Sequence, residues 1–206
     1  MGRVFVKQLP LGDMENFTYI VGDKSAGEAF VVDPSGPWDI ILGELKAEGL
    51  VLKGVLLTHG HYDHVVGIDK ADVPLYLSEA EAPFYTPRAK NFVRTKDSQE
   101  IPLGGLVVTC LHTPGHTPGC QCFLVDGNLF TGDTLFVDAV GRTDLPGGSS
   151  AVLFKSLQRI KALPDATTVW PGHHYGAVPH DTLGHLKENN PFLVCTDAGE
   201  FEGYLG

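Results

Sequence analysis

One heptapeptide dominates the interpretation of this sequence, Thr58-His59-Gly60-His61-Tyr62-Asp63-His64. It directly follows a short apolar run at residues 53–57, which has the composition of a buried strand. In an extended loop alternate side chains point the same way, so His59 and His61 can face one point. Asp63 and His64 follow where the chain turns and can face a neighbouring point. Because divalent cations of the zinc type prefer imidazole and carboxylate ligands, the loop predicts a metal site.

A polar loop that happens to be rich in histidine is the alternative interpretation of this stretch. The chain of 206 residues has nine histidines in all, and three of them fall within six positions here, beside an aspartate. This grouping favours the metal site.

Three later loops could supply the remaining ligands, because each follows an apolar run and contains glycine. His116 lies in a loop after residues 106–111, Asp133 follows residues 128–131, and His173 follows residues 167–170. Small neighbours let the backbone approach a metal closely. We interpret His112 and His174 as loop residues rather than ligands.

The coarse pattern of the chain alternates strands with helices. Strands are expected at residues 4–8, 17–21, 28–33, 53–57, 74–77, 106–111, 121–125, 128–131 and 167–170. Helices are expected at residues 37–48, 65–71, from 78 onward, 149–163 and 181–188, with an irregular stretch to about 99. Periodicity alone indicates a mixed α and β domain, and the order of elements suggests two sheets packed face to face.

Composition argues against several classes of function. The net charge is −10, from 15 basic and 25 acidic side chains, and no basic cluster of the kind that binds nucleic acid is present. No apolar run approaches the roughly 20 residues of a membrane span. The four cysteines do not form a disulfide framework for a chain of this length, and Cys120 and Cys122 are expected to share one buried face of a strand. We expect a cytoplasmic protein.

Taken together, these loops resemble the metallo-β-lactamase superfamily, and their context is similar to its glyoxalase II (hydroxyacylglutathione hydrolase) branch. The resemblance runs from about residue 4 to residue 193. The strings that carry it are Thr58-His59-Gly60-His61-Tyr62-Asp63-His64, Thr113-Pro114-Gly115-His116-Thr117-Pro118-Gly119, Thr131-Gly132-Asp133-Thr134-Leu135-Phe136 and Pro171-Gly172-His173.

The resemblance implies an α/β fold, an αββα sandwich of two mixed β-sheets with helices on the outer faces. It also implies two divalent ions, zinc in the first place, with iron or manganese as alternatives. The ligands implied for the first ion are His59, His61 and His116. Those implied for the second are Asp63, His64 and His173.

Three aspartates have special roles under this resemblance. Asp133 would bridge both ions, which argues against a true β-lactamase, and Asp63 and Asp133 would be the catalytic carboxylates. Asp33 matches a position that braces the metal loop, although by its own chemistry it could equally start a turn.

Two further residues stand where glyoxalase II binds glutathione, namely Arg142 and Tyr175. A salt bridge between Arg142 and Asp144, and simple packing of Tyr175, are the alternatives. Longer members of the family carry a C-terminal helical domain that contributes cationic contacts to glutathione. We expect one domain over residues 1–206 without that extension, which leaves the thiol carrier open.

The implied reaction is hydrolysis of a small-molecule thioester by a metal-bound hydroxide, with glutathione as one candidate for the thiol carrier. The main alternative is a persulfide dioxygenase with one iron on His59, His116 and Asp133, because Gly141-Arg142-Thr143-Asp144 also resembles those enzymes. Phosphodiester hydrolysis fits an acidic protein poorly. A purely structural zinc site is disfavoured, since such sites are usually closed and rich in cysteine. The sequence predicts nothing about oligomeric state.

Overall fold

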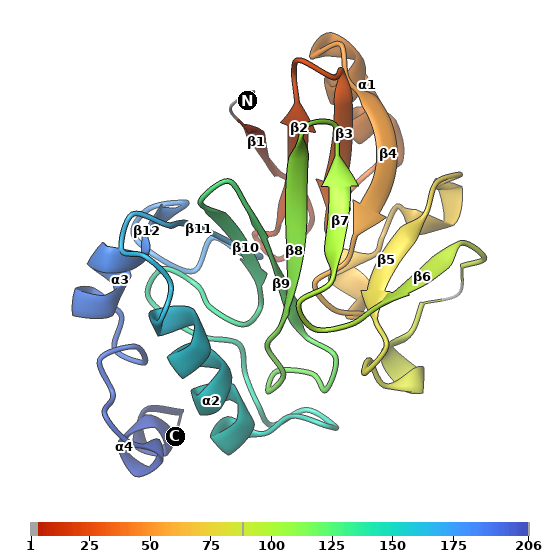
Figure 1. Cartoon of the computed structure of the whole chain (residues 1–206). Helices are drawn as coiled ribbons and strands as arrows, with labels where there is room; N and C mark the ends of the chain where they lie inside the picture. Colours follow the sequence, from red (N-terminus) through yellow and green to blue (C-terminus); the bar gives the residue numbers. More distant parts are fainter. Residues whose placement is uncertain (1–3, 88, 206) are drawn as a thin grey trace.

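Two six-stranded sheets pack face to face in the computed structural model, which describes residues 4–87 and 89–205 (Figure 1). The strands of the first sheet lie in sequence order: β1 (Phe5–Pro10), β2 (Phe17–Asp23), β3 (Glu28–Val32), β4 (Val51–Leu56), β5 (Leu75–Ser78) and β6 (Phe92–Thr95). Pairing is antiparallel from β1 to β3 and parallel from β3 to β6, so this sheet is mixed.

The second sheet is also mixed and runs in the order β12-β11-β10-β9-β8-β7. Its strands are β7 (Glu100–Leu103), β8 (Leu106–His112), β9 (Gln121–Val125), β10 (Asn128–Gly132), β11 (Thr168–Pro171) and β12 (Asp181–Thr182). Only β10 and β11 pair in parallel; the other neighbours are antiparallel.

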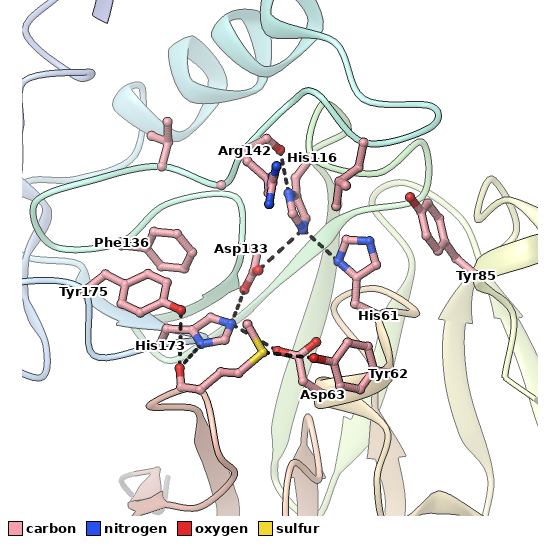
Figure 2. A pocket seen from close by; sticks show the side chains of 14 residues that line it. His61, Tyr62, Asp63, Tyr85, His116, Asp133, Phe136, Arg142, His173 and Tyr175 are labelled. Carbon is pink, nitrogen blue, oxygen red and sulfur yellow. Dashed lines mark hydrogen bonds and ion pairs between the residues drawn. The ribbon is translucent and has the colours of Figure 1, made fainter. Parts of the chain in front are cut away.

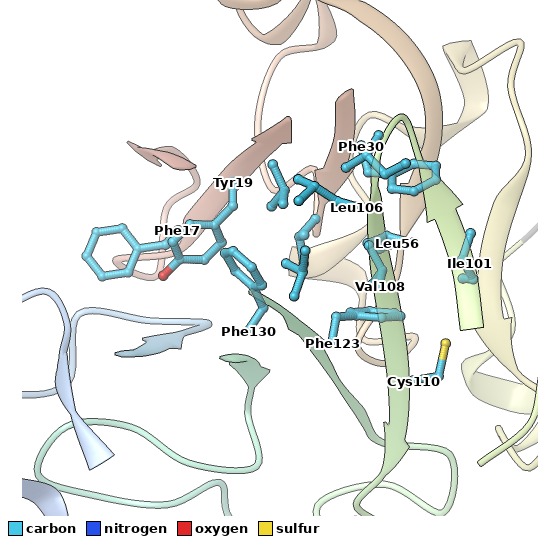
Figure 3. Close-up of a cluster of buried hydrophobic side chains, with 14 residues drawn as sticks. Phe17, Tyr19, Phe30, Leu56, Ile101, Leu106, Val108, Cys110, Phe123 and Phe130 are labelled. Atoms are coloured by element: carbon cyan, nitrogen blue, oxygen red, sulfur yellow. The ribbon is translucent and has the colours of Figure 1, made fainter. Parts of the chain in front are cut away.

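The main core lies between the two sheets (Figure 3). Tyr19 and Phe30 of the first sheet meet Val108, Phe123 and Phe130 of the second, and all of these side chains are buried. Successive side chains of a strand point to opposite faces, so alternate residues of each strand enter this layer. The core is therefore built from strand residues, and the loops at the ends of the sheets can hold functional side chains.

Helices cover both outer faces. Helix α1 (Trp38–Ala47) packs Ile41 and its neighbours against the outer side of the first sheet. Helix α2 (Ser150–Lys161) packs Leu153 and Leu157 against the second sheet, together with α3 (Leu183–Asn189) and α4 (Ala198–Leu205). The expected αββα sandwich is confirmed.

Two expected helices are wrong. Residues 65–71 form only a short 3₁₀ turn, Ile68–Lys70, because Gly67 packs against the Gly36 carbonyl and the Trp38 ring and its N–H bonds to the carbonyl oxygen of Pro34. The segment after Ser78 contains the 3₁₀ turn Pro83–Tyr85 instead of a helix, because Pro83 has no N–H to continue a helical ladder.

Several other boundaries differ from the expectation. Strands β6 and β7 and helix α4 were not expected, and β6 occupies part of the stretch that was expected to be irregular. The helix expected at residues 181–188 begins at Leu183, since Thr182 caps it and Asp181 pairs with β11. Cys120 and Cys122 are buried, as expected, and so are Cys110 and Cys195. Among the described residues, no helix has the length and apolar character needed to cross a bilayer.

Candidate metal centre

Four loops at one end of the sandwich bring the seven predicted ligands together. The loop after β4 carries His59 to His64, and the loops after β8, β10 and β11 carry His116, Asp133 and His173. The ligands form two groups, and within each group the donor atoms lie within 4.8 Å of one another. The groups are His59, His61, His116 and Asp133, here called the first cluster, and Asp63, His64 and His173, here called the second cluster.

Backbone carbonyls fix the ring orientation of two of the histidines. Nδ1 of His116 lies 2.7 Å from the carbonyl oxygen of Arg142, and Nδ1 of His173 lies 2.8 Å from that of Met14. A carbonyl oxygen can only accept, so each Nδ1 carries the proton and each Nε2 keeps its lone pair. Both lone pairs are thereby available to a metal.

Asp33 orients two more histidines. Its carboxylate accepts from the N–H of Thr58 at 2.8 Å, from the Thr58 hydroxyl at 2.6 Å and from Nδ1 of His64 at 3.0 Å. Because the Thr58 hydroxyl donates to Asp33, it accepts in turn from Nδ1 of His59, 3.1 Å away. In the neutral rings this arrangement places the proton on Nδ1 and leaves the lone pair of Nε2 for a metal.

The first cluster is a convergence of imidazole lone pairs. Nδ1 of His61 lies 3.0 Å from Nε2 of His59 and 2.9 Å from Nε2 of His116. A single proton cannot satisfy three such nitrogens, whereas a cation can. If Nδ1 of His61 faces a metal, Nε2 carries the ring's proton; this nitrogen is buried and has no hydrogen-bond partner among the described residues. The donors therefore fit a divalent ion.

Asp133 lies between the clusters and presents one oxygen to each (Figure 2). Its Oδ2 is 3.4 Å from Nε2 of His116, and its Oδ1 is 3.2 Å from Nε2 of His64 and 3.3 Å from Nε2 of His173. A Cβ on Gly172 would lie 2.6 Å from Oδ1, so this close approach requires glycine. One carboxylate thus faces the histidine nitrogens of both clusters.

The second cluster is completed by Asp63. Its Oδ2 lies 3.5 Å from Nε2 of His64 and 3.5 Å from Nε2 of His173. The side-chain amide of Asn16 donates to the same oxygen at 2.9 Å, and Asn16 also forms a β-bridge with His173. Asn16 was not predicted as a site residue, because a single asparagine near a turn carries no signal in the sequence.

Burial and charge separate the two clusters electrostatically. Burial, with the charge of His64 next, holds the pKa of His59 well below its ordinary value, and burial lowers the pKa of His61 to about 4. Burial also disfavours protonation of His64 and His173, but attraction to Asp133 outweighs it and raises both pKa values. His59 and His61 are thus neutral and ready for a metal, whereas protons compete with a metal at His64 and His173.

The centre opens into a pocket of about 600 Å³ (Figure 2). Much of the lining is apolar or aromatic, including Tyr62, Tyr85, Phe136, Val140 and Leu145. Tyr85 was not predicted; its ring meets that of His61 edge-on, with centroids 4.6 Å apart. The pocket is suited to a small molecule with an apolar portion.

Both predicted substrate residues line this pocket, each with other partners as well. The Arg142 guanidinium forms two hydrogen bonds with Asp144, of 2.6 and 2.7 Å, which lower the pKa of that carboxyl to about 2. Tyr175 stacks on His173, with centroids 4.7 Å apart, and its hydroxyl donates to the carbonyl oxygen of Met14. Within the protein, Arg142 thus pairs with Asp144, and Tyr175 packs against His173. These are the alternatives to substrate binding given above for the two residues.

Comparison with known proteins places this centre in a family. The family model described as the metallo-beta-lactamase superfamily matches residues 11–173, which include all seven predicted ligands. The chain belongs to the metallo-β-lactamase superfamily.

Individual relatives resemble most of the chain. A Bacillus velezensis protein named as a probable polyketide biosynthesis zinc-dependent hydrolase, BaeB, is 40% identical over 196 residues, covering 92% of this chain and 86% of its own. A hydroxyacylglutathione hydrolase from Shewanella halifaxensis is 32% identical over 186 residues, covering 87% and 70%. The crystal structure of ETHE1 from Myxococcus xanthus superposes with a TM-score of 0.84 at 30% identity, covering 98% and 89%.

Geometry and relatives agree on the general chemistry. The two His/Asp clusters fit a binuclear centre of divalent ions, as expected for the superfamily. The chain is a metal-dependent hydrolase of the metallo-β-lactamase superfamily.

Proposed function

We propose that the protein hydrolyses thioesters with an apolar acyl group and uses two divalent ions to do so. The observation that carries this proposal is the position of Asp133, whose two oxygens face separate groups of donor nitrogens. When bound, divalent ions supply a hydroxide nucleophile near neutral pH and polarise the carbonyl of the substrate. No serine or cysteine nucleophile is required.

The protein's own residues hold and tune the ions. His59, His61 and His116 would hold one ion, and Asp63, His64 and His173 the other, with Asp133 shared. The carbonyl oxygens of Arg142 and Met14 and the carboxylate of Asp33 accept hydrogen bonds from Nδ1 of three of these histidines. These bonds fix which ring nitrogen faces the metal and raise the basicity of the ring. Asn16 holds Asp63 in the orientation that the second ion requires.

The pocket lining favours an apolar acyl group. Besides the predicted ligands, Arg142 is the one cation among the described residues that line the pocket, and Asp144 already pairs with it. Glutathione carries two carboxylates, and only Arg142 is available to meet them here. Tyr85, Phe136 and Leu145 instead offer an apolar surface beside the ligands.

A panel of thioesters tests this function. With zinc-loaded protein, S-hexanoylglutathione should give a kcat/KM about tenfold or more above that of S-lactoylglutathione, since each buried methylene contributes to binding. S-hexanoyl-N-acetylcysteamine removes the glutathione carboxylates and should remain a substrate. No turnover of any thioester by fully metallated protein would contradict the proposal.

Arg142 can be tested on the same panel as the proposed contact to a substrate carboxylate. Replacing it in Arg142→Gln should raise KM a few-fold for glutathione thioesters and leave the N-acetylcysteamine thioester unchanged. An equal change for both carriers would show that Arg142 acts through its pairing with Asp144 rather than on the substrate.

The iron dioxygenase alternative uses only part of this site. One iron on His59, His116 and Asp133 would leave the second cluster without a metal. The donors of that cluster are nevertheless oriented by hydrogen bonds with Met14, Asp33 and Asn16. Elemental analysis should therefore find two divalent ions per chain. One iron per chain, with oxygen uptake on glutathione persulfide, would instead support the dioxygenase.

A further inference from the structure

A buried carboxylate outside the predicted ligand set, that of Glu81, joins two of the metal-binding loops. Its Oε2 accepts from the N–H of Gly60 at 3.1 Å and from the hydroxyl of Thr117 at 2.9 Å. Its Oε1 accepts from the N–H of Ala82 at 2.9 Å. The residue is only 5% exposed. We propose that Glu81 is a positioning residue that sets the metal affinity of the first cluster; this inference rests on the two-metal centre proposed above.

The partners of Glu81 are the immediate neighbours of metal ligands. Gly60 lies between His59 and His61, and Thr117 follows His116. One oxygen of Glu81 therefore ties together the loops that supply all three histidines of the first cluster. Any change in its position would be passed to both loops at once.

The cost of burying this charge argues that it has a role. No lysine, arginine or histidine lies within 4.0 Å of the Glu81 carboxylate in the part of the chain that the structure describes. A buried carboxylate without a cation is unfavourable unless hydrogen-bond donors replace the lost water. Here the N–H of Gly60 and the hydroxyl of Thr117 replace the lost water. The carboxylate keeps its hydrogen bonds only while both loops hold their positions.

Close packing leaves the segment around Glu81 little freedom to shift. A Cβ on Gly119 would lie 2.3 Å from Cα of Glu81, and a Cβ on Gly60 would lie 1.7 Å from the carbonyl oxygen of Tyr85. The Tyr85 ring packs against His61, and its hydroxyl donates to the carbonyl oxygen of Pro146. The segment after β5 is thus packed closely against the loops of the first cluster.

Asp33 and Glu81, the two buried carboxylates outside the two clusters that contact the metal-binding loops, act mainly on different clusters. Asp33 bonds directly to the ring of His64 in the second cluster and reaches His59 only through Thr58. Glu81 acts through backbone and hydroxyl donors on the loops of His61 and His116. Loss of Glu81 should therefore weaken one of the two ions selectively.

Cobalt titration of the metal-free protein tests this selectivity. In Glu81→Gln the amide oxygen can still accept, but the amide nitrogen only donates, so it cannot serve both the Oε1 contact with Ala82 and the Oε2 contacts with Gly60 and Thr117. One of the two Co²⁺ equivalents should therefore bind about 10- to 100-fold more weakly, as for other groups that orient metal ligands. The visible absorption bands of that ion should change, while those of the other ion stay as in the wild type. Thr117→Val removes a single donor and should weaken the same ion by a few-fold.

Asp23→Asn is the matched control. Asp23 is likewise a buried carboxylate that accepts from backbone N–H groups, those of Ser25, Ala26 and Gly105, but it lies at the far end of β2 from Phe17, which bonds to Gly172 in the metal region. This variant should lower the melting temperature without changing the affinity for either ion.

Two outcomes would overturn the inference. One is unchanged two-step Co²⁺ binding in both Glu81→Gln and Thr117→Val. The other is equal weakening of both ions in proportion to the loss of stability. Since metal affinity is measured without substrate, inactivity on thioesters overturns the proposed function and leaves this test intact. If the wild type binds one ion, the two-metal proposal fails, and the affinity for that ion in Glu81→Gln decides the role of Glu81.

Discussion

At the scale of single residues, Asp133 connects the two clusters through its carboxylate. Asp133→Asn keeps the shape of the side chain but turns an amide group toward one cluster, so we expect one ion to be lost and kcat to fall by about 100-fold or more. Metal content and kcat measured on the same sample check this. Asp69→Asn, at an exposed aspartate, is the control and should change neither quantity. A fully active, two-metal Asp133→Asn protein would contradict the bridging role.

Asp33 combines a hydrogen-bonding role with an unusual backbone conformation. Its φ of +46° lies in the left-handed region, which asparagine tolerates better than alanine. Asp33→Asn should therefore fold and bind zinc about 10- to 100-fold more weakly, because the acceptor for His64 is weakened. Asp33→Ala should in addition lose stability. Zinc titration and thermal unfolding separate the two effects; equal melting temperatures for the two variants would argue against backbone strain.

The pH dependence of metal binding follows from the pKa shifts. A raised pKa keeps an imidazole protonated to higher pH, and a protonated nitrogen has no lone pair for a metal. The pKa values of His64 and His173 are raised, whereas burial lowers that of His61 to about 4 and also holds that of His59 well below its ordinary value. Lowering the pH should therefore release the ion of the second cluster first.

Zinc retained after dialysis at a series of pH values measures this order. The wild type should pass from two ions to one before losing the last. His173→Ala, which lacks one donor of the second cluster, should start at one ion and retain it over the lower part of the same range. Simultaneous loss of both ions would show that the clusters do not titrate separately.

The convergence of the loop after β4 on the candidate centre could be predicted from the sequence because its signal is local. Three histidines and an aspartate lie within six positions directly after an apolar strand, which is an unusual grouping: His59, His61, Asp63 and His64. Asn16 and Glu81 act through contacts with residues far away in the chain, and their residue types are common in ordinary turns. Only the folded chain brings them to the metal-binding loops.

At the scale of structural elements, glycine in the metal-binding loops permits contacts that no other residue allows. Gly60→Ala would place a Cβ 1.7 Å from the carbonyl oxygen of Tyr85, so the loop must shift, with an expected loss of about 1–3 kcal/mol in the free energy of unfolding and weaker zinc binding. Denaturant unfolding and zinc titration check both effects.

The control for that substitution is Gly43→Ala in helix α1. Nothing lies within 4 Å of a Cβ at this position, and alanine is a better helix former than glycine. This variant should gain about 0.5–1 kcal/mol and bind zinc normally. Similar behaviour of the two variants would show that the contact with Tyr85 is not tight.

Elements with a clear apolar period were predicted well, and those fixed by tertiary contacts were not. Helix α2 shows its buried face in Leu153, Leu157 and Ile160, and it was expected within a residue or two of its observed bounds. The pattern at residues 65–71 is similar, but contacts of Gly67 with the segment before α1 override it. Strand β7 is short and contains Pro102, which weakens the sequence signal for an edge strand.

At the scale of the whole molecule, the metal centre joins the two sheets. The loop after β4 of the first sheet supplies His59 to His64, and loops of the second sheet supply His116, Asp133 and His173. Ions held by both should therefore stabilise the packing of one sheet against the other.

Removal of the metal should lower thermal stability. A ligand at 100 times its dissociation constant contributes about 2.7 kcal/mol, and each kcal/mol corresponds to about 2–4 °C for a domain of this size. Calorimetry with and without a chelator, followed by re-addition of zinc, measures the shift. Equal melting temperatures for the two forms would contradict a linking role for the centre.

The overall architecture followed from the resemblance more than from periodicity. Apolar patterns alone predict a mixed α and β domain, because they do not say which strands pair or which face a helix covers. The contact between Tyr19 and Phe130, which joins the sheets, links residues more than 100 positions apart. The family motifs bring in this long-range information.

The order in which the two clusters receive their residues along the chain has a consequence for biosynthesis. A ribosome delivers all the donors of the first cluster once Asp133 has emerged, but the second cluster must wait for His173. Loading of the ions is thereby tied to the order of translation, with the first ion available to a chain made as far as Asp133 and the second only to a chain that extends past His173. Chains stalled between Asp133 and His173 should accordingly capture one zinc ion, and released chains two.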